Sequence, residues 1–148
     1  MSTNRSKIYR KIMNSLEASG ALVEASAKLL CPVDLGRLRD SIHHKVNMED
    51  LSVTIGTNVE YAAWVEFGTG EKAEKGDGRK GGWVYQSDHK QAKGLLIGET
   101  KDGKYLYFTR GSKPQPFLRP ALLENKENIR KIFEKGKVGD SLQYTGEI

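Results

Sequence analysis

The sequence predicts a single α+β domain over residues 1–136. A small, mainly antiparallel sheet packs against long N-terminal and C-terminal helices, and a glycine-rich loop projects from it. Two observations support this fold class. Apolar residues recur at helical spacing near both ends of the chain, and short alternating segments lie between them. The resulting order, helix, hairpin, helix, strands, helix, favours an antiparallel sheet over an alternating parallel fold.

The first helix is expected from about residue 4 to residue 30, because one face of it repeats apolar and small side chains. Gly20 weakens the prediction in the middle. Pro32 ends the helix, since the residue before a proline is disfavoured in helical conformation. Asp34 is then expected to cap a short turn through Arg39. The expected inward stripe is Ile8, Ile12, Leu16, Ser19, Leu22 or Val23, Ser26 and Leu29 or Leu30.

A hairpin is expected next, because apolar residues alternate on both sides of Glu49-Asp50. Its second strand ends at Gly56. A short helix over Tyr61–Phe67 follows, and Gly68 ends it by adopting a positive φ at little steric cost. One face of the hairpin would carry Ile42, His44, Val46, Met48, Leu51, Val53 and Ile55.

The loop at residues 70–82 contains five glycines and seven charged residues, which is too polar a composition to order by itself. Strands are expected at residues 83–85, 95–97 and 104–109, where apolar and aromatic residues gather.

The last helix is expected from about Phe117 to Lys135, with Gly136 as its cap. Residues 137–148 read as a loose tail. The inward positions would be Leu118, Leu122, Ile129 and Phe133.

Composition limits the function classes. The 148 residues have a net charge of +5, but 24 Lys and Arg are interleaved with 19 acids and form no dense block. This pattern is typical of a solvated mixed-charge surface. Cys31 is the single cysteine, which excludes an internal disulfide and suits a reducing cytoplasm. No apolar run approaches the ~18 residues of a membrane span, and no signal peptide is visible.

No enzymatic, cofactor or metal site is predicted. The segment Gly76–Gly81 fits G-x-G-x-x-G, but a strand follows it where a dinucleotide site needs a helix. His43 and His44 would point to opposite faces of a strand, so they do not share an ion easily. Cys31 lacks an evident base. The acids Asp34, Asp40 and Glu66 have no defined spacing, and His89 is the only further histidine.

Several motifs together resemble the small neck or minor tail proteins of long-tailed bacteriophages and prophages. The resemblance covers roughly residues 5–135, but residues 86–104 and those after Gly136 match no motif of the family. The motifs are Pro32–Ile42, Tyr61–Gly70, Gly81–Tyr85, Thr109–Gly111 and Pro114–Ala121. The positions that it marks as structural are Gly36, Leu38, Arg39, Tyr61, Glu66, Phe67, Gly68, Pro116, Phe117 and Pro120.

The resemblance implies a structural virion protein that acts in head–tail joining or tail completion and is assembled in the cytoplasm of the bacterial host. Its partners would be other neck and tail proteins (the connector, the tail terminator or the tail tube), and it would form a homo-oligomeric ring. The candidate interface residues are Lys72, Lys75, Arg79, Lys80, Arg110, Lys113 and Arg119.

The alternative is a basic DNA-binding module, because the loop region mixes cations with aromatic side chains. Its residues would be Lys72, Lys75, Arg79, Lys80, Trp83, Tyr85 and Lys90.

The prolines around Phe117 restrict the backbone, so its ring is expected in the core near the Tyr61–Phe67 segment. Arg119 would then be exposed or paired with an acid such as Glu66.

Overall fold

The computed structural model describes residues 2–33 and 35–136. The predicted cap Asp34 and the predicted tail at residues 137–148 lie outside the described residues. The chain forms two compact units, residues 1–60 with 116–148 and residues 61–115. The expectation of a single domain over residues 1–136 stays a prediction.

The elements of the first unit are α1 (Ser2–Leu30), α2 (Gly36–Ser41), β1 (His43–Asn47), β2 (Ser52–Gly56), α4 (Leu118–Glu124) and α5 (Lys126–Lys135). Those of the second are α3 (Ala62–Phe67), the 3-10 turn η1 (Gly70–Lys72), β3 (Trp83–Ser87), β4 (Leu95–Glu99) and β5 (Tyr105–Thr109). The α+β class and the antiparallel strands are confirmed. In place of one sheet, however, the described chain has two, β1–β2 and β3–β5–β4.

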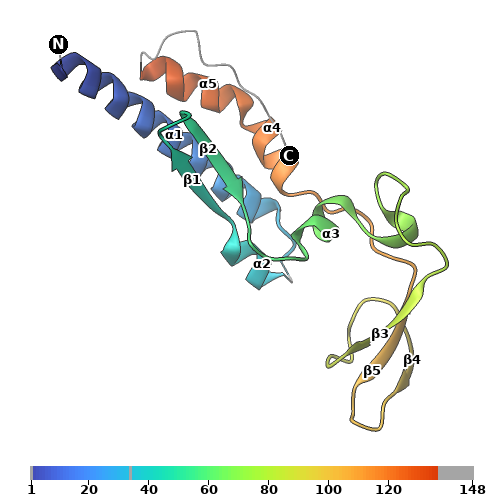
Figure 1. Cartoon of the computed structure of the whole chain (residues 1–148). Coiled ribbons are helices and arrows are strands. Elements are labelled where there is room, and N and C mark those ends of the chain that lie inside the picture. The colour runs from blue at the N-terminus through green and yellow to red at the C-terminus, as the bar shows by residue number, and fades with distance from the viewer. Residues whose placement is uncertain (1, 34, 137–148) are drawn as a thin grey trace. The chain divides into compact units, whose positions relative to one another are not determined.

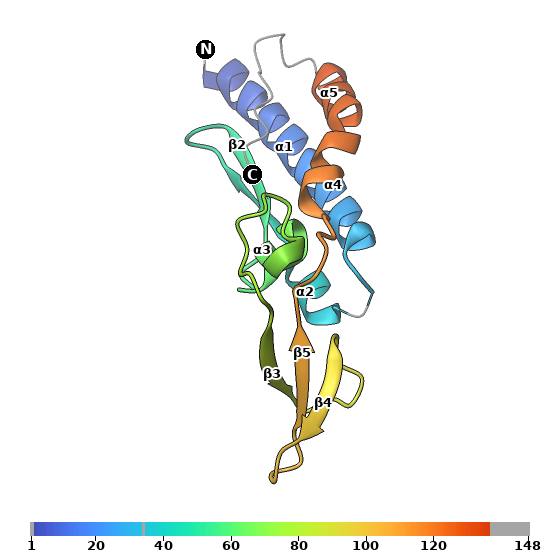
Figure 2. The ribbon, with the colours of Figure 1, turned by 90° about the vertical axis from the view of Figure 1, so that its right-hand side faces the viewer.

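In the first unit α1 lies between the β1–β2 hairpin and the pair α4 and α5 (Figures 1 and 2). Its buried face is narrower than the predicted stripe. The stripe is wrong at both ends, because Ile8 is 56% and Leu29 is 86% exposed. The core along α1 consists of Ile12, Ser15, Leu16, Ser19, Val23 and Ala27.

The hairpin register matches the predicted alternation. His44 is opposite Ile55, and Val46 is opposite Val53, so these four side chains share one face of the ribbon. Gly20 of α1 lies under this face. A Cβ at Gly20 would come within 2.6 Å of the His44 ring and 2.7 Å of Val53. The glycine that weakens the helix pattern is therefore what permits the hairpin to lie close to the helix.

The predicted last helix is interrupted at Asn125, between α4 and α5. The side chain of Asn125 is buried, and its amide donates to the hydroxyl of Ser26 and to the carbonyl of Ala121, both at 2.7 Å. This competition by a side-chain amide for backbone partners is typical of helix ends. Gly136 does follow the last turn, but in the right-handed conformation. Phe117 is completely buried, as expected.

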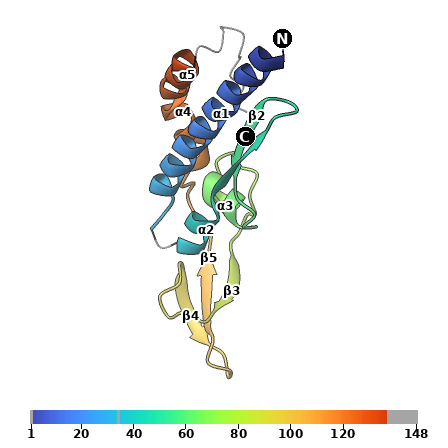
Figure 3. The same cartoon turned by 90° about the vertical axis from the view of Figure 1, so that its left-hand side faces the viewer.

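In the second unit β5 is the central strand, with β3 and β4 antiparallel on either side of it (Figures 1 and 3). The α3 helix ends at Gly68, which has φ 77° and ψ 177°. Positive φ was expected there, but this ψ lies in a region that is almost restricted to glycine. A Cβ at Gly68 would also come within 2.8 Å of the carbonyl oxygen of Ser112.

Candidate interface

Backbone hydrogen bonds tie the start of the glycine-rich loop to the chain that follows β5. The amide of Thr69 donates to the carbonyl of Ser112, and that of Glu71 donates to the carbonyl of Arg110, both at 2.9 Å. We call this pairing of Thr69–Glu71 with Arg110–Ser112 the loop junction. The loop therefore has a defined path, which its composition did not predict.

Two glycines make the loop junction sterically possible. A Cβ at Gly70 would lie 2.4 Å from the carbonyl oxygen of Arg110, and a Cβ at Gly111 would lie 2.0 Å from that of Thr69. Both glycines also have positive φ, 60° and 111°. The two motifs that contain them, far apart in the sequence, form one structural feature because neither backbone carries a side chain at the contact.

An ion pair between Arg110 and Glu71 connects the two segments of the loop junction. The Glu71 carboxylate accepts hydrogen bonds from the Gly81 amide and the Arg110 guanidinium, both at 3.0 Å. The Gly81 amide and then Arg110 hold the pKa of Glu71 below its ordinary value of 4.5. Arg110 also lies over the ring of Phe108, and Arg79 lies over that of Trp83, at 5.9 and 5.6 Å.

Six of the seven predicted interface cations belong to the second unit, where they are exposed. They are Lys72, Lys75, Arg79, Lys80, Arg110 and Lys113. Arg119 lies in α4 of the first unit and is half-buried. Its expected pairing with Glu66, like the expected position of Phe117 beside Tyr61–Phe67, joins the two units and stays a prediction.

The motif positions are mostly buried or at element ends. Leu38 of α2 and Glu66 of α3 are buried to 0% and 2% exposure. Gly36 begins α2, and Tyr61 precedes α3. Half-buried positions are Arg39, Tyr61, Phe67 and Pro120, and Pro116 is exposed.

One face of the three-stranded sheet is covered by its own connection. Tyr107 is almost fully buried, and its hydroxyl donates to the carbonyls of His89 and Lys90. Tyr85 stacks on Tyr107 with ring centroids 5.7 Å apart, and its hydroxyl donates to the Lys93 carbonyl. Tyr85 is therefore a packing residue of this face and is not free to stack on a nucleic-acid base.

The opposite face of the same sheet is apolar and open. Val84 and Leu95 are both paired with Phe108, so the three side chains form a row across the sheet. Val84 is 52% and Leu95 is 67% exposed. With the half-buried Leu106, two positions before Phe108, they form what we call the apolar sheet face. The alternation in residues 104–109 is the sequence signal of this face, but an alternation does not say which of its two faces is covered.

The histidine pair is divided between two environments, as predicted. His43 is exposed, whereas His44 lies between two carboxylates of α1, 2.5 Å from Glu24 and 2.9 Å from Glu17. The hydrogen bonds to Glu17 and Glu24 raise the pKa of His44 above 6.5. Lys28 and then His44 lower the pKa of Glu24 to about 2. The hydrogen bonds from His44 to Glu17 and Glu24 connect β1 to α1.

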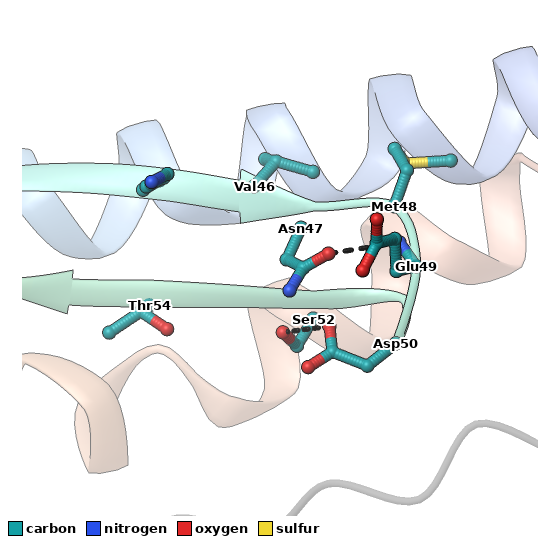
Figure 4. A pocket seen from close by; sticks show the side chains of 8 residues that line it. Val46, Asn47, Met48, Glu49, Asp50, Ser52 and Thr54 are labelled. Carbon is teal, nitrogen blue, oxygen red and sulfur yellow. Dashed lines mark hydrogen bonds between the residues drawn. The ribbon is translucent and has the colours of Figure 1, made fainter.

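Figure 4 shows the end of the β1–β2 hairpin, where a shallow pocket is lined by turn residues. The side-chain oxygen of Asn47 accepts from the Glu49 amide, and the Ser52 hydroxyl donates to Asp50. These bonds stabilise the turn. Among residues 2–33 and 35–136, no group of three or more His, Cys, Asp and Glu could hold a metal ion. Cys31 is buried.

The comparisons with known proteins concern the N-terminal part of the chain. Residues 3–68 match the family described as "Bacteriophage HK97-gp10, putative tail-component". The family resemblance is confirmed over these residues. The match includes α1, the hairpin and α3, and its description names a tail component and no enzymatic activity. No curated protein and no solved structure matches the chain. No helix in the described part of the chain is long and apolar enough to cross a membrane.

Proposed function

We propose that this protein is a structural component of the phage virion that acts in head–tail joining or tail completion. It forms a homo-oligomeric ring and docks onto the connector, the tail terminator or the tail tube. The match of residues 3–68 to a family of phage tail components supports the virion assignment. The apolar sheet face, which remains open in the single chain, supports the assembly.

Exposed apolar area is unfavourable in water, and this favours assembly. Val84 and Leu95 lie in one row with Phe108 and are more than half exposed. A contiguous apolar surface of this kind is typical of a protein–protein contact. The six predicted interface cations of the second unit lie on the same unit as this face and would form a polar rim around it. A ring needs two different patches that meet head-to-tail, and the apolar sheet face would be one of them.

Size-exclusion chromatography with light scattering at several concentrations tests self-association. We expect the wild type to form a closed oligomer, with a mass that is a multiple of the 16.5 kDa chain mass, as the protein concentration rises. The double variant Val84→Ser, Leu95→Ser should remain a monomer. Leu123→Ser, which changes a similarly exposed side chain of α4, is the matched control and should assemble like the wild type.

A wild type that stays monomeric at high concentration, also when mixed with head-connector and tail proteins, contradicts the proposal. Assembly of the Val84 and Leu95 double variant at wild-type concentrations would show that another surface makes the ring.

A further inference from the structure

The first turns of α1 form a basic arm, by which we mean Asn4–Lys11. All eight of its residues are exposed, and the first buried side chain of the helix is Ile12. The arm, the dark-blue end of α1 in Figure 1, thus extends past the packed core of the first unit. A helical segment with no fully buried side chain contributes little to folding, so its composition indicates another use.

The charges of the arm have one sign. Residues 2–16 contain four cations and no acid. Within the described residues, none of these cations forms an ion pair. Cations near a helix N-terminus oppose the helix dipole and weaken the helix. This arrangement is therefore unfavourable for the free protein. The four are Arg5, Lys7, Arg10 and Lys11.

Three of the four cations of the arm gather on one side. Lys7 and Lys11 are one turn apart on a face away from Ile12, with Arg10 beside them. Arg5 lies on the side of Ile8 and Ile12. This face spans about 15 Å from Asn4 to Asn14 at the rise of an α-helix. It offers ammonium, guanidinium and amide donors and no carboxylate.

The neighbouring helix adds to the positive charge. α5 runs beside the first half of α1 in all three views (Figures 1 to 3). Residues 2–16 and α5 together carry eight cations and two acids, a balance of +6. The whole chain carries +5, so all its other residues together carry −1. The charge that looked evenly spread along the sequence is concentrated at one end of the first unit.

We propose that the basic arm, with α5 beside it, contacts the phosphate backbone of double-stranded DNA. Five of these eight cations are lysines, and protein–protein interfaces are depleted in lysine. Phosphate contacts, in contrast, need only clustered cations and hydrogen-bond donors. The contact is independent of base sequence, since a helix that meets the backbone alone reads no base edges. This proposed DNA contact is an addition to the proposed role in the virion. It does not depend on the apolar sheet face.

Fluorescence anisotropy with the full-length chain and a labelled duplex of arbitrary sequence tests the arm. The variant is Lys7→Gln, Arg10→Gln, Lys11→Gln. The matched control is Lys72→Gln, Lys75→Gln, Lys80→Gln, which removes the same charge from the loop. Affinity should fall linearly with salt on logarithmic axes between about 50 and 200 mM. The slope of log affinity against log salt should be shallower by roughly 2.7 in the arm variant, which corresponds to about 0.9 for each of three lost phosphate contacts. The loop variant should keep the wild-type slope.

Circular dichroism melts accompany the titrations, and neither triple variant should melt below the wild type. No binding of the wild type at about 50 mM salt overturns the proposal, as does an equal loss in the loop variant. A poly-glutamate competitor that displaces the duplex at lower charge concentration than unlabelled DNA also overturns it, in favour of an acidic protein partner. Light scattering on the arm variant shows whether its loss of DNA binding is separate from ring formation. The oligomer mass should equal that of the wild type.

Discussion

At the residue scale, Gly20 positions the hairpin on α1. Gly20→Ala adds a methyl group 2.6 Å from the His44 ring, which is held by two carboxylates and cannot move easily. The gain in helix propensity is about 1 kcal/mol, and overpacking costs about 1–3 kcal/mol. We expect a net loss of up to about 2 kcal/mol in the free energy of unfolding, measured by urea denaturation.

The control for this substitution is Ala18→Gly, at an exposed position of the same helix. It should cost about 1 kcal/mol through propensity alone. If Gly20→Ala instead raises stability by a similar amount, the hairpin does not press on the helix as the structure shows.

His44 gives the protein a pH-dependent stability. Its pKa is raised above 6.5 in the folded state by hydrogen bonds to Glu17, the larger effect, and to Glu24. Glu24 also accepts a hydrogen bond from Lys28. The charged form is therefore favoured by folding. Its contribution is complete below pH 6.5 and is lost as the pH rises through the higher folded pKa. We expect the urea midpoint to decrease over that window in the wild type.

His44→Gln should abolish this part of the pH dependence, whereas His43→Gln should keep it because His43 is exposed. Glu24 acts in the acid range. Its pKa of about 2 means that its contribution is present above 4.5 and lost as the pH falls toward 2. An identical alkaline slope in the wild type and His44→Gln would contradict the assignment to His44.

At the scale of elements, the break between α4 and α5 depends on one buried amide. Asn125 joins α4 to α1 through the hydroxyl of Ser26. Asn125→Ala leaves that hydroxyl without this partner, and we expect a loss of about 1–3 kcal/mol. A double-mutant cycle with Ser26→Ala should give a coupling energy of about 0.5–1.5 kcal/mol by thermal or urea unfolding.

Lys131→Ala, at an exposed position of α5, is the control and should stay within about 0.5 kcal/mol of the wild type. A coupling energy near zero would show that the Asn125 break is set by the backbone and that the bond to Ser26 is incidental.

At the scale of the whole molecule, the two units should unfold together. Among the described residues, Ala62 and Tyr107 are the only buried apolar side chains of residues 61–115. So small a core does not stabilise a unit of this size alone. The chain also passes between the units twice, near residues 60 and 116. We expect a single calorimetric transition.

One substitution in each unit tests this prediction. Phe117→Ala empties a fully buried site of the first unit and should cost about 3–5 kcal/mol. Gly111→Ala forces a Cβ against the Thr69 carbonyl in the second unit. Both variants should lower the same transition. Two transitions, each moved by only one of the variants, would show that the units are independent domains.

The sequence by itself determined most of the elements, their order along the chain and the family resemblance. The reason is that α1, the hairpin, α3 and β5 depend on local periods and on breakers such as Pro32 and Gly68, which act within a few residues. The burial of Phe117 was also predictable, because two prolines restrict the backbone around it.

Only the tertiary structure decided what depends on residues far apart in the chain. Gly20 looked like a weakness until the hairpin lay over it, and Gly70 and Gly111 became one junction only when their backbones met. The apolar sheet face and the +6 end of the first unit arise in the same way. Periodicity says which side chains share a face, but burial and charge density depend on what packs against that face.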